Sequence, residues 1–320
     1  MGSVSVLIRY IRNVAAVSSF VLATAGLVGD EPRAPAPEFS SGKTRGIFFD
    51  SIEDAFRGER PTLSSLRKNA ASASSKTSSA TADAAESSES TNRWTKLISP
   101  TSLEDEVKRV RLHYDSVITT PGAFNGGGYQ DARLDLSILA TMFAVIDLHG
   151  EDVRWKDQAA AARDLLARTA FNCKAGSTQV YNEAKLRKAD LQDLVSGSGL
   201  ADRDADELTD WSSIVDRSPM MEYAEATLDS LKGVTNNEAT AKNNVDQVRR
   251  EAEVLAVIGL VLTQEGMDDF DDADYAALSQ AMTESARAAV TALERNDFEE
   301  VRKSVGAITQ SCDACHEQYR

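Results

Sequence analysis

Two cysteines and a histidine near the end of the chain have the spacing that covalent haem attachment requires. Cys312, Cys315 and His316 form the pattern Cys-x-x-Cys-His. Such attachment needs two thiols that reach the two vinyl groups of one porphyrin, and an imidazole that reaches the iron from the same side. On a helix, positions i, i+3 and i+4 share a face, so all three side chains can meet one ring. The pattern therefore predicts one covalently bound haem.

The residues that lead into this pattern favour a helix. Apolar side chains recur there at alternating steps of three and four residues, which is typical of the buried seam of an amphipathic helix. The seam comprises Phe298, Val301, Val305, Ile308, Cys312, Cys315 and Tyr319. Both cysteines are therefore expected on the packed face of the last helix.

Two other uses of these residues stay open. A disulfide between Cys312 and Cys315 is one, although it leaves the adjacent His316 unexplained. A thiol or metal module that uses the same three residues without haem is the other. The third cysteine, Cys173, lies far away in the sequence and is expected to be a small buried hydrophobic residue.

The N-terminus has the features of an export signal. Arg9 and Arg12 precede an apolar stretch, and Ala23-Thr24-Ala25 supplies small residues for cleavage after Ala25. An uncleaved anchor is the alternative, because residues 26–28 prolong the apolar run. No later segment is long and apolar enough to span a membrane. A periplasmic or otherwise exported protein is therefore expected, and export suits c-type haem attachment, which takes place outside the cytoplasm.

A segment of biased composition follows the signal. Residues 70–92 are almost entirely Ser, Ala and Thr with a few charges, and such a composition buries too little apolar surface to offset chain entropy. We therefore expect a signal peptide at 1–25, a disordered linker at 26–93, and folded domains at 94–205 and 206–320.

The two folded parts repeat each other. Leu139-Ala140 and the later Gly150 match Leu255-Ala256 and Gly266 at an offset of 116 residues. Ser-Pro, which suits a helix start, opens both copies at Ser99-Pro100 and Ser218-Pro219, an offset of 119. The repetition indicates a duplicated unit.

Each copy is expected to contain four helices. In the second copy they are predicted at about 219–234, 239–264, 272–294 and 296–318. Alanine is abundant and aromatic residues make up 6% of the chain, which favours helical bundles. Gly126-Gly127-Gly128 is expected in a loop between helices, since it lacks the strand and lysine of a phosphate-binding loop. The predicted fold is all-α, with two tandem antiparallel four-helix bundles.

The first copy lacks the haem pattern. At an offset of 117 in the last helix, Val195, Ser198 and Gly199 take the places of Cys312, Cys315 and His316. Phe143 stands where the second copy has Gly259, as expected if a side chain fills volume that a porphyrin would take.

A Cys-x-x-Cys-His at the very end of a four-helix bundle resembles the class II cytochromes c, that is, cytochrome c prime and its six-coordinate relatives. The resemblance rests on Cys312, Cys315, His316, Tyr319 and Arg320 and covers about residues 218–320. It implies that both cysteines form thioethers to haem c, that His316 is the iron ligand, and that Arg320 is the basic residue beside the haem. An ordinary helix-terminal cation is the alternative for Arg320, and Tyr319 is expected to pack in the core.

The identity of the sixth iron ligand distinguishes two possible functions, electron transfer and gas binding. Six-coordinate relatives place a methionine on the first helix, where this chain has Met220 and Met221, followed on the same face by Ala224 and Leu228. A methionine ligand would give an electron carrier. An apolar face would leave five-coordinate iron that binds nitric oxide or carbon monoxide. Met220 and Met221 also suit ordinary packing, and His113 and His149, in the first copy, are not expected to bind iron.

The charge distribution restricts the partners. The 320-residue chain has a net charge of −15. Residues 218–320 hold 20 acidic and 9 basic side chains, with a cluster of five Asp between 268 and 274. The cluster fits a solvated loop and helix start or, alternatively, a surface that steers a basic redox partner. Nucleic acid is disfavoured by sign. No catalytic acid, base or nucleophile constellation is recognisable, so one-electron transfer is expected and an enzyme is not.

Overall fold

The computed structural model describes residues 93–200, 205, 207–208 and 210–319. All regular structure in these residues is helical, which confirms the predicted all-α class of tandem helical bundles. No helix within them is long and apolar enough to cross a membrane. The predicted signal peptide at 1–25, residues 26–92 of the predicted linker, and Arg320 lie outside the described residues.

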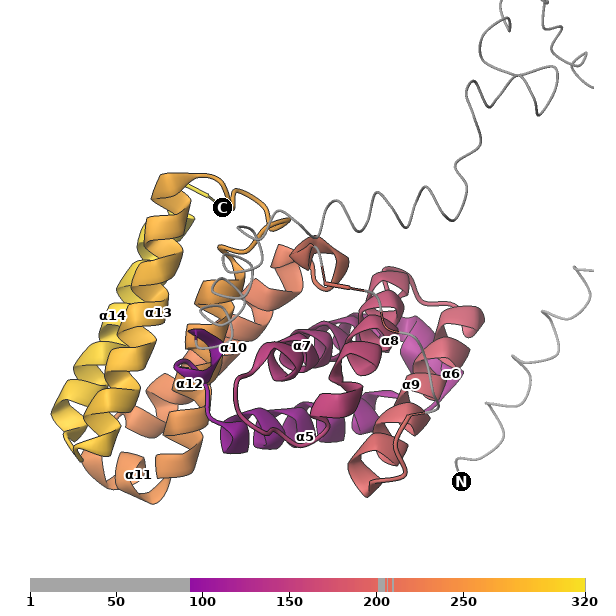
Figure 1. The fold of residues 1–320 in the computed structure, drawn as a ribbon, viewed down its shortest axis with the longest axis horizontal. Helices are drawn as coiled ribbons and strands as arrows, with labels where there is room; N and C mark the ends of the chain where they lie inside the picture. The colour runs from indigo at the N-terminus through magenta and orange to yellow at the C-terminus, as the bar shows by residue number, and fades with distance from the viewer. Residues whose placement is uncertain (1–92, 201–204, 206, 209, 320) are drawn as a thin grey trace, which may run out of the picture. The chain divides into compact units, whose positions relative to one another are not determined.

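The first repeat is a closed bundle of four helices (Figure 1). Each helix packs on the next, and the fourth packs back on the first. These helices are α5 (Pro100–Val117), α7 (Tyr129–Leu148), α8 (Ala159–Asn172) and α9 (Thr178–Ser196). Between α5 and α7, the short α6 (Pro121–Ala123) leads into a kinked segment, η1 (Phe124–Gly128), and a single turn, η2 (Lys156–Gln158), precedes α8. The predicted glycine loop is this kink, where Gly127 is non-helical and has a φ of 143° that favours glycine.

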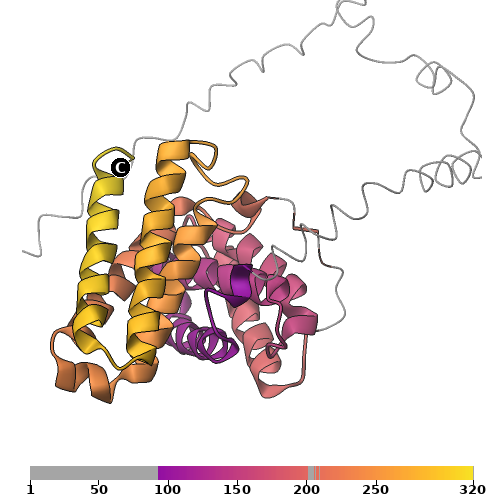
Figure 2. The ribbon, with the colours of Figure 1, turned by 60° about the vertical axis from the view of Figure 1, so that its left-hand side comes forward.

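The second repeat closes in the same order. Its four long helices are α10 (Arg217–Thr235), α12 (Val245–Val261), α13 (Ala273–Glu294) and α14 (Phe298–His316). The predicted second helix is divided by Asn244 into α11 (Glu238–Asn243) and α12. The other predicted helices agree with the structure within two residues at each end. Figures 1 and 2 both show α13 and α14 side by side, as their extensive contact requires.

Side-chain caps fix where several helices begin. Ser99 accepts a hydrogen bond from the backbone N–H of Ser102 and precedes Pro100, so the predicted start of the first helix is confirmed. The second predicted Ser-Pro start is wrong by two residues, because α10 begins at Arg217, after its N-cap Asp216. Ser99 and Asp216 are therefore equivalent, which corrects the offset of the first helices from 119 to 117 residues.

The last helices also require a different offset. Both α9 and α14 have 19 residues, from Thr178 and Phe298 respectively, so their offset is 120 rather than the predicted 117. The counterparts of Cys312, Cys315 and His316 are then Gln192, Val195 and Ser196. This corrects the predicted counterparts Val195, Ser198 and Gly199. The first repeat still has no thiol or imidazole at these places.

The second helix of each repeat is the most deeply buried element. Every residue of α7 from 135 to 146 is buried, and so is every residue of α12 from 251 to 259. A helix that is apolar on nearly all sides must be covered on nearly all sides. Both helices are, because α7 also packs on α10 and α12 also packs on α5. These two contacts join the repeats within one compact unit.

Candidate functional site

The Cys-x-x-Cys-His residues occupy the last two turns of α14. The first four residues of the predicted apolar seam, Phe298, Val301, Val305 and Ile308, are buried as expected. Cys312 and Cys315 are half-buried and pack against the apolar core, while His316 is exposed in the last turn of the helix. The seam thus reaches the surface where the two thiols lie, one turn apart and on the same side of α14.

The two thiols are free in the structure. Cys312 and Cys315 are not joined to each other or to Cys173. Burial raises the pKa of Cys312 and that of Cys315 above the usual value of 9.0.

The third cysteine behaves as the sequence predicts. Cys173 is fully buried, and burial raises its pKa to about 12. It is a small core residue of the first repeat.

The three chemical groups of α14 do not meet at one point. Within the described ranges, no set of three His, Cys, Asp or Glu side chains is placed to hold a metal ion. A metal module would need Cys312, Cys315 and His316 to converge. Covalent haem does not require the three groups to converge on one atom, because the thiols bond the edge of the ring and only the imidazole binds iron. The donor set on this helix end comprises two thiols and one imidazole, the types that covalent haem requires.

An arginine and two tyrosines surround Cys315. The guanidinium of Arg217, at the start of α10, lies 4.8 Å from the ring centre of Tyr275, at the start of α13. Tyr275 in turn packs edge-on against Tyr319 at 5.1 Å, so the expectation that Tyr319 packs is met. Both Arg217 and Tyr275 are electrostatic neighbours of Cys315. Sequence reasoning did not identify Arg217 or Tyr275 as site residues, because no spacing rule links the first turns of α10 and α13 to the last turn of α14.

The acidic cluster lies beside this arginine. Arg217 Nη2 is 2.7 Å from Asp269 Oδ2, and Arg217 Nε is 3.5 Å from Asp268 Oδ2. Asp272 accepts from the backbone N–H groups of Asp274 and Tyr275, which makes it the N-cap of α13 and lowers its pKa. The solvated loop and helix start expected from the sequence is therefore present, with one cation bound to it.

The methionines expected near the iron differ in burial. Met220 is fully buried, while Met221 is half-buried against the core. Ala224 and Leu228, on the same face of α10, are also buried. This face of α10 is apolar, and α10 packs on α14.

The two remaining histidines have local partners in the first repeat. His113 Nδ1 lies 2.8 Å from Asp135 Oδ2, and His149 is buried with its Nε2 3.0 Å from the carbonyl oxygen of Ile98. Neither lies on α14 or α10.

The proposed porphyrin volume at Gly259 has a different explanation. A Cβ at this position would lie 2.9 Å from the carbonyl oxygen of Ser279 and would also clash with Thr283 Oγ1. Gly259 therefore permits α12 to pack closely on α13, and the prediction that it leaves volume for a haem is not supported. Phe143, its counterpart, is buried and packs against Trp155 at 6.1 Å.

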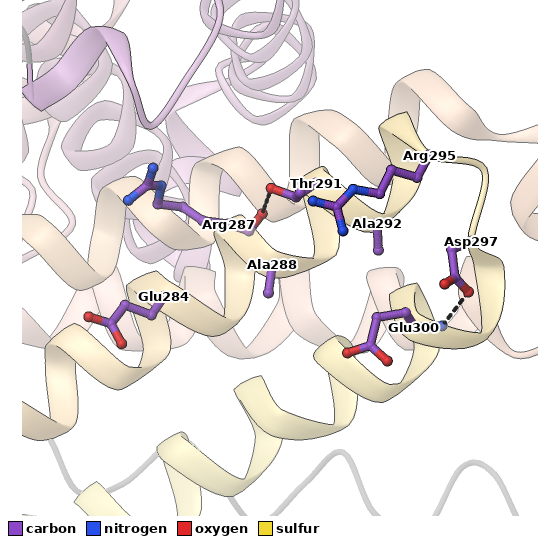
Figure 3. Close-up of a pocket in the computed structure, with 8 residues that line it drawn as sticks. All are labelled: Glu284, Arg287, Ala288, Thr291, Ala292, Arg295, Asp297 and Glu300. Carbon is purple, nitrogen blue, oxygen red and sulfur yellow. Dashed lines mark hydrogen bonds between the residues drawn. The ribbon is translucent and has the colours of Figure 1, made fainter.

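A surface groove at the opposite end of the α13–α14 hairpin contains none of the predicted site residues (Figure 3). Its walls carry charges of both signs, including Glu284, Arg287, Arg295 and Glu300, and its floor includes Ala288 and Ala292. Asp297 in this groove accepts from the backbone N–H of Glu300 and so caps α14. The groove is explained by the turn between the two helices.

Comparison with known families agrees with the chemistry of α14. Residues 270–320, which carry α13 and α14, match the family described as Cytochrome C'. The match confirms the resemblance predicted from the sequence in this segment. Neither the curated proteins nor the solved structures contain a match to the chain.

Proposed function

We propose that the chain is an exported one-electron carrier in which the second repeat, residues 206–320, holds one covalent haem c. The observation that carries this proposal is the pair of free, half-buried thiols at the end of α14, followed directly by an exposed imidazole, within a segment that matches Cytochrome C'. The first repeat, residues 94–205, has no such residues and binds no haem.

The chain's own groups divide the work of holding the cofactor. Cys312 and Cys315 would hold the haem through two thioethers, each formed when one S–H adds across one vinyl group with nothing released. His316 would supply an imidazole nitrogen to the iron. The bound haem supplies an iron centre that takes up and gives back one electron.

Arg217 is suited to offset negative charge beside the site. It lies next to Cys315 and over the ring of Tyr275, and its cationic form is stabilised by Asp268 and Asp269. Arg320 is proposed for the same task from the family resemblance alone, since it lies outside the described residues. A cation near an iron ligand or a haem carboxylate tunes the affinity for the electron.

The acidic side chains beside the site favour a basic redox partner. The exposed Asp271 and Asp274 lie in the same segment as the pair bound by Arg217, close to the end of α14. Opposite charges on the two proteins would accelerate their encounter at low ionic strength.

Binding of a small gas ligand is the second candidate function, and the apolar face of α10 favours it. Ala224 and Leu228 follow the two methionines on that face, and both are buried. Methionine ligation by Met220 or Met221 gives the carrier, while a purely apolar face gives five-coordinate iron that takes up nitric oxide or carbon monoxide.

Mass and absorption measurements on the full chain, made in a host that attaches haem c, test these proposals. A mass increase equal to one haem that survives denaturation is expected. Its absence, or an increase equal to two haems, would contradict the proposal. A reduced absorption spectrum that carbon monoxide leaves unchanged supports the carrier, and a shifted spectrum supports gas binding.

A further inference from the structure

The contact between the repeats has the pattern of a two-fold axis. The first helix of each repeat packs on the second helix of the other, as α5 on α12 and α10 on α7. Exchanging the repeats therefore turns one contact into the other. The N-cap residue of the first helix in each repeat likewise contacts the second helix of the other repeat. Ser99 donates from its N–H and its hydroxyl to Glu253 of α12, and its counterpart Asp216 pairs with Arg133 of α7 at 2.5 Å.

Two pairs of equivalent residues touch each other, which happens only near a two-fold axis. At the offset of 117, Trp94 corresponds to Trp211, and their rings lie 5.4 Å apart. At the same offset Glu106 corresponds to Tyr223, and the Tyr223 hydroxyl donates to Glu106 Oε1. The two repeats are thus arranged like the subunits of a symmetric dimer within one chain.

The chemistry at this axis is not symmetric. Glu106 is 2% exposed and is the acceptor at the centre of the contact. It binds Arg109 at 2.9 Å and 3.0 Å and pairs with Arg250 Nε of α12 at 3.1 Å, besides accepting from Tyr223. The counterpart of Glu106 is Tyr223, which carries no charge, and the counterpart of Arg250 at the offset of 116 is Leu134. The acid at the place of Glu106 is therefore present only in the first repeat, and the arginine at the place of Arg250 only in the second, while Arg109 of the first repeat also contacts Tyr223 across the axis.

We propose that the face of α10 and α12 is a specific docking surface for the first repeat, and that this chemistry rejects a second copy of the haem-bearing repeat. In a pair of second repeats, each Arg250 would meet the partner's Tyr223 in place of Glu106 and would keep only Glu251 of its own helix, at 3.8 Å. In a pair of first repeats, two Glu106 side chains would approach each other and face Leu134. A buried charge without its partner is costly. Only the mixed pair satisfies both Glu106 and Arg250, so the interface selects it by repelling the alternatives.

This inference does not depend on haem, since every group in the contact belongs to the protein. It gives the first repeat a role that requires no cofactor. The first repeat covers the face of α10 and α12, and α10 also contacts the haem-bearing α14.

The pairing can be tested on the full chain after it has folded. A specific protease site is inserted between Leu200 and Asp210, and the folded protein is cut there. One preparation is labelled with heavy isotopes, mixed with an unlabelled one, and allowed to exchange. Native mass spectrometry then counts the pairs. We expect only pairs of one first repeat with one second repeat (first–second pairs), and some of these should contain one labelled and one unlabelled repeat. Pairs of two second repeats, or separated halves, would overturn the proposal.

One substitution should redirect the pairing. Tyr223→Glu gives the second repeat the acid that its own Arg250 would meet across the axis, and it places a second carboxylate beside Glu106 in the mixed pair. Because Arg109 contacts position 223 in the mixed pair and offsets part of the added charge, we expect second–second pairs to appear beside first–second pairs. Ala288→Glu adds the same charge on the exposed surface of α13 and should leave the pairing unchanged. If both variants keep their helical circular dichroism yet pair alike, the assigned specificity is wrong. The wild-type exchange decides the question independently should Tyr223→Glu not fold.

Discussion

Helices α9 and α14 occupy the same place in the two bundles and have the same length, but they end differently. Helix α9 stops at Gly197, whose φ of 88° breaks the helix and lets the backbone N–H groups of Gly197 and Ser198 close the last turn. The cap of α14 is Glu317 in the right-handed conformation, after Cys312, Cys315 and His316. The comparison indicates that the bundle depends on the apolar seam, while the chemistry depends on three residues in the last two turns.

A second pair of equivalent sites shows how one position can be used in two ways. His113 and Asp135 of the first repeat correspond to Ser230 and Glu251 of the second, and both pairs join the first helix to the second helix of the same repeat. The carboxylates are buried in both, and burial raises the pKa of each. The position of the carboxyl is thus retained in both repeats, whereas its partner differs.

The sharpest test of the difference between the repeats removes both thiols of α14. The double variant Cys312→Ala, Cys315→Ala should lose all covalent haem, because no thioether can form. Intact mass under denaturing conditions measures this. The matched control is Cys173→Ala in the first repeat, which should keep the full haem mass. Haem retained by the double variant would refute the assigned attachment site.

The next largest effect is expected from removing Glu106, the acceptor at the centre of the contact between the repeats. Glu106→Gln removes the buried carboxylate that pairs with both Arg109 and Arg250, and it leaves Arg250 only the more distant Glu251. The free energy of unfolding should therefore fall by about 3 kcal/mol. Denaturant unfolding of the full chain measures the change. Glu104→Gln on the same helix breaks only the pair with Lys108, which is partly exposed, and should cost less than about 1 kcal/mol. Equal losses in the two variants would mean that Glu106 has no special role.

The two buried carboxylates should give the bundles a pH dependence. Burial raises the pKa of Asp135 from 3.8 to about 6. The folded state therefore holds this proton more tightly than the unfolded chain, and this group's contribution to stability falls as pH rises through that range. Asp135→Asn should flatten the fall in unfolding free energy between those pH values, and Glu251→Gln should act in the same direction.

The control for the pH experiment lies on another helix. Asp193 is exposed on α9 and does not contribute to the pKa of Asp135, so Asp193→Asn should leave the pH profile parallel to that of the wild type. If the unfolding free energy of Asp135→Asn falls with pH as steeply as that of the wild type, the buried carboxyl of Asp135 does not cause the pH dependence.

The smallest expected effect comes from removing either of two equivalent helix caps, one in each repeat. Ser177 caps α9 by accepting from Val180 N–H, and Asp297 caps α14 in the same way from Glu300 N–H. Replacing either by Ala should lower the midpoint of thermal unfolding through a loss of about 1 kcal/mol. Gln310→Ala, at an exposed position inside α14, should cause no loss. A larger effect at Asp297 alone would indicate that α14 depends more on its first turn than α9 does.

Much of the fold could be predicted because helix periodicity is a local signal. The four helices of the second repeat were predicted nearly to the residue, except for the break at Asn244, where the backbone leaves the helical conformation and no Gly or Pro announces it. The offset of 119 was wrong because Ser-Pro is a common helix start, and its two occurrences are not equivalent. The pair Trp94 and Trp211 at an offset of 117 was present in the sequence and would have corrected it.

The site was only partly predictable, for a physical reason. Cys312, Cys315 and His316 are close in sequence, so spacing alone identifies them. Arg217 and Tyr275 reach the same helix end through the packing of α10 and α13, and a single sequence contains no signal for that. The assignment of Gly259 failed because a glycine on a buried face fits a close helix contact as well as a large ligand.

The pseudo-dimeric contact between α5, α7, α10 and α12 has a consequence for how the protein behaves at low abundance. Two separate subunits dissociate on dilution, whereas two units on one chain meet at an effective concentration set by the connecting residues. The second repeat therefore stays paired with the first repeat even at very low protein concentration.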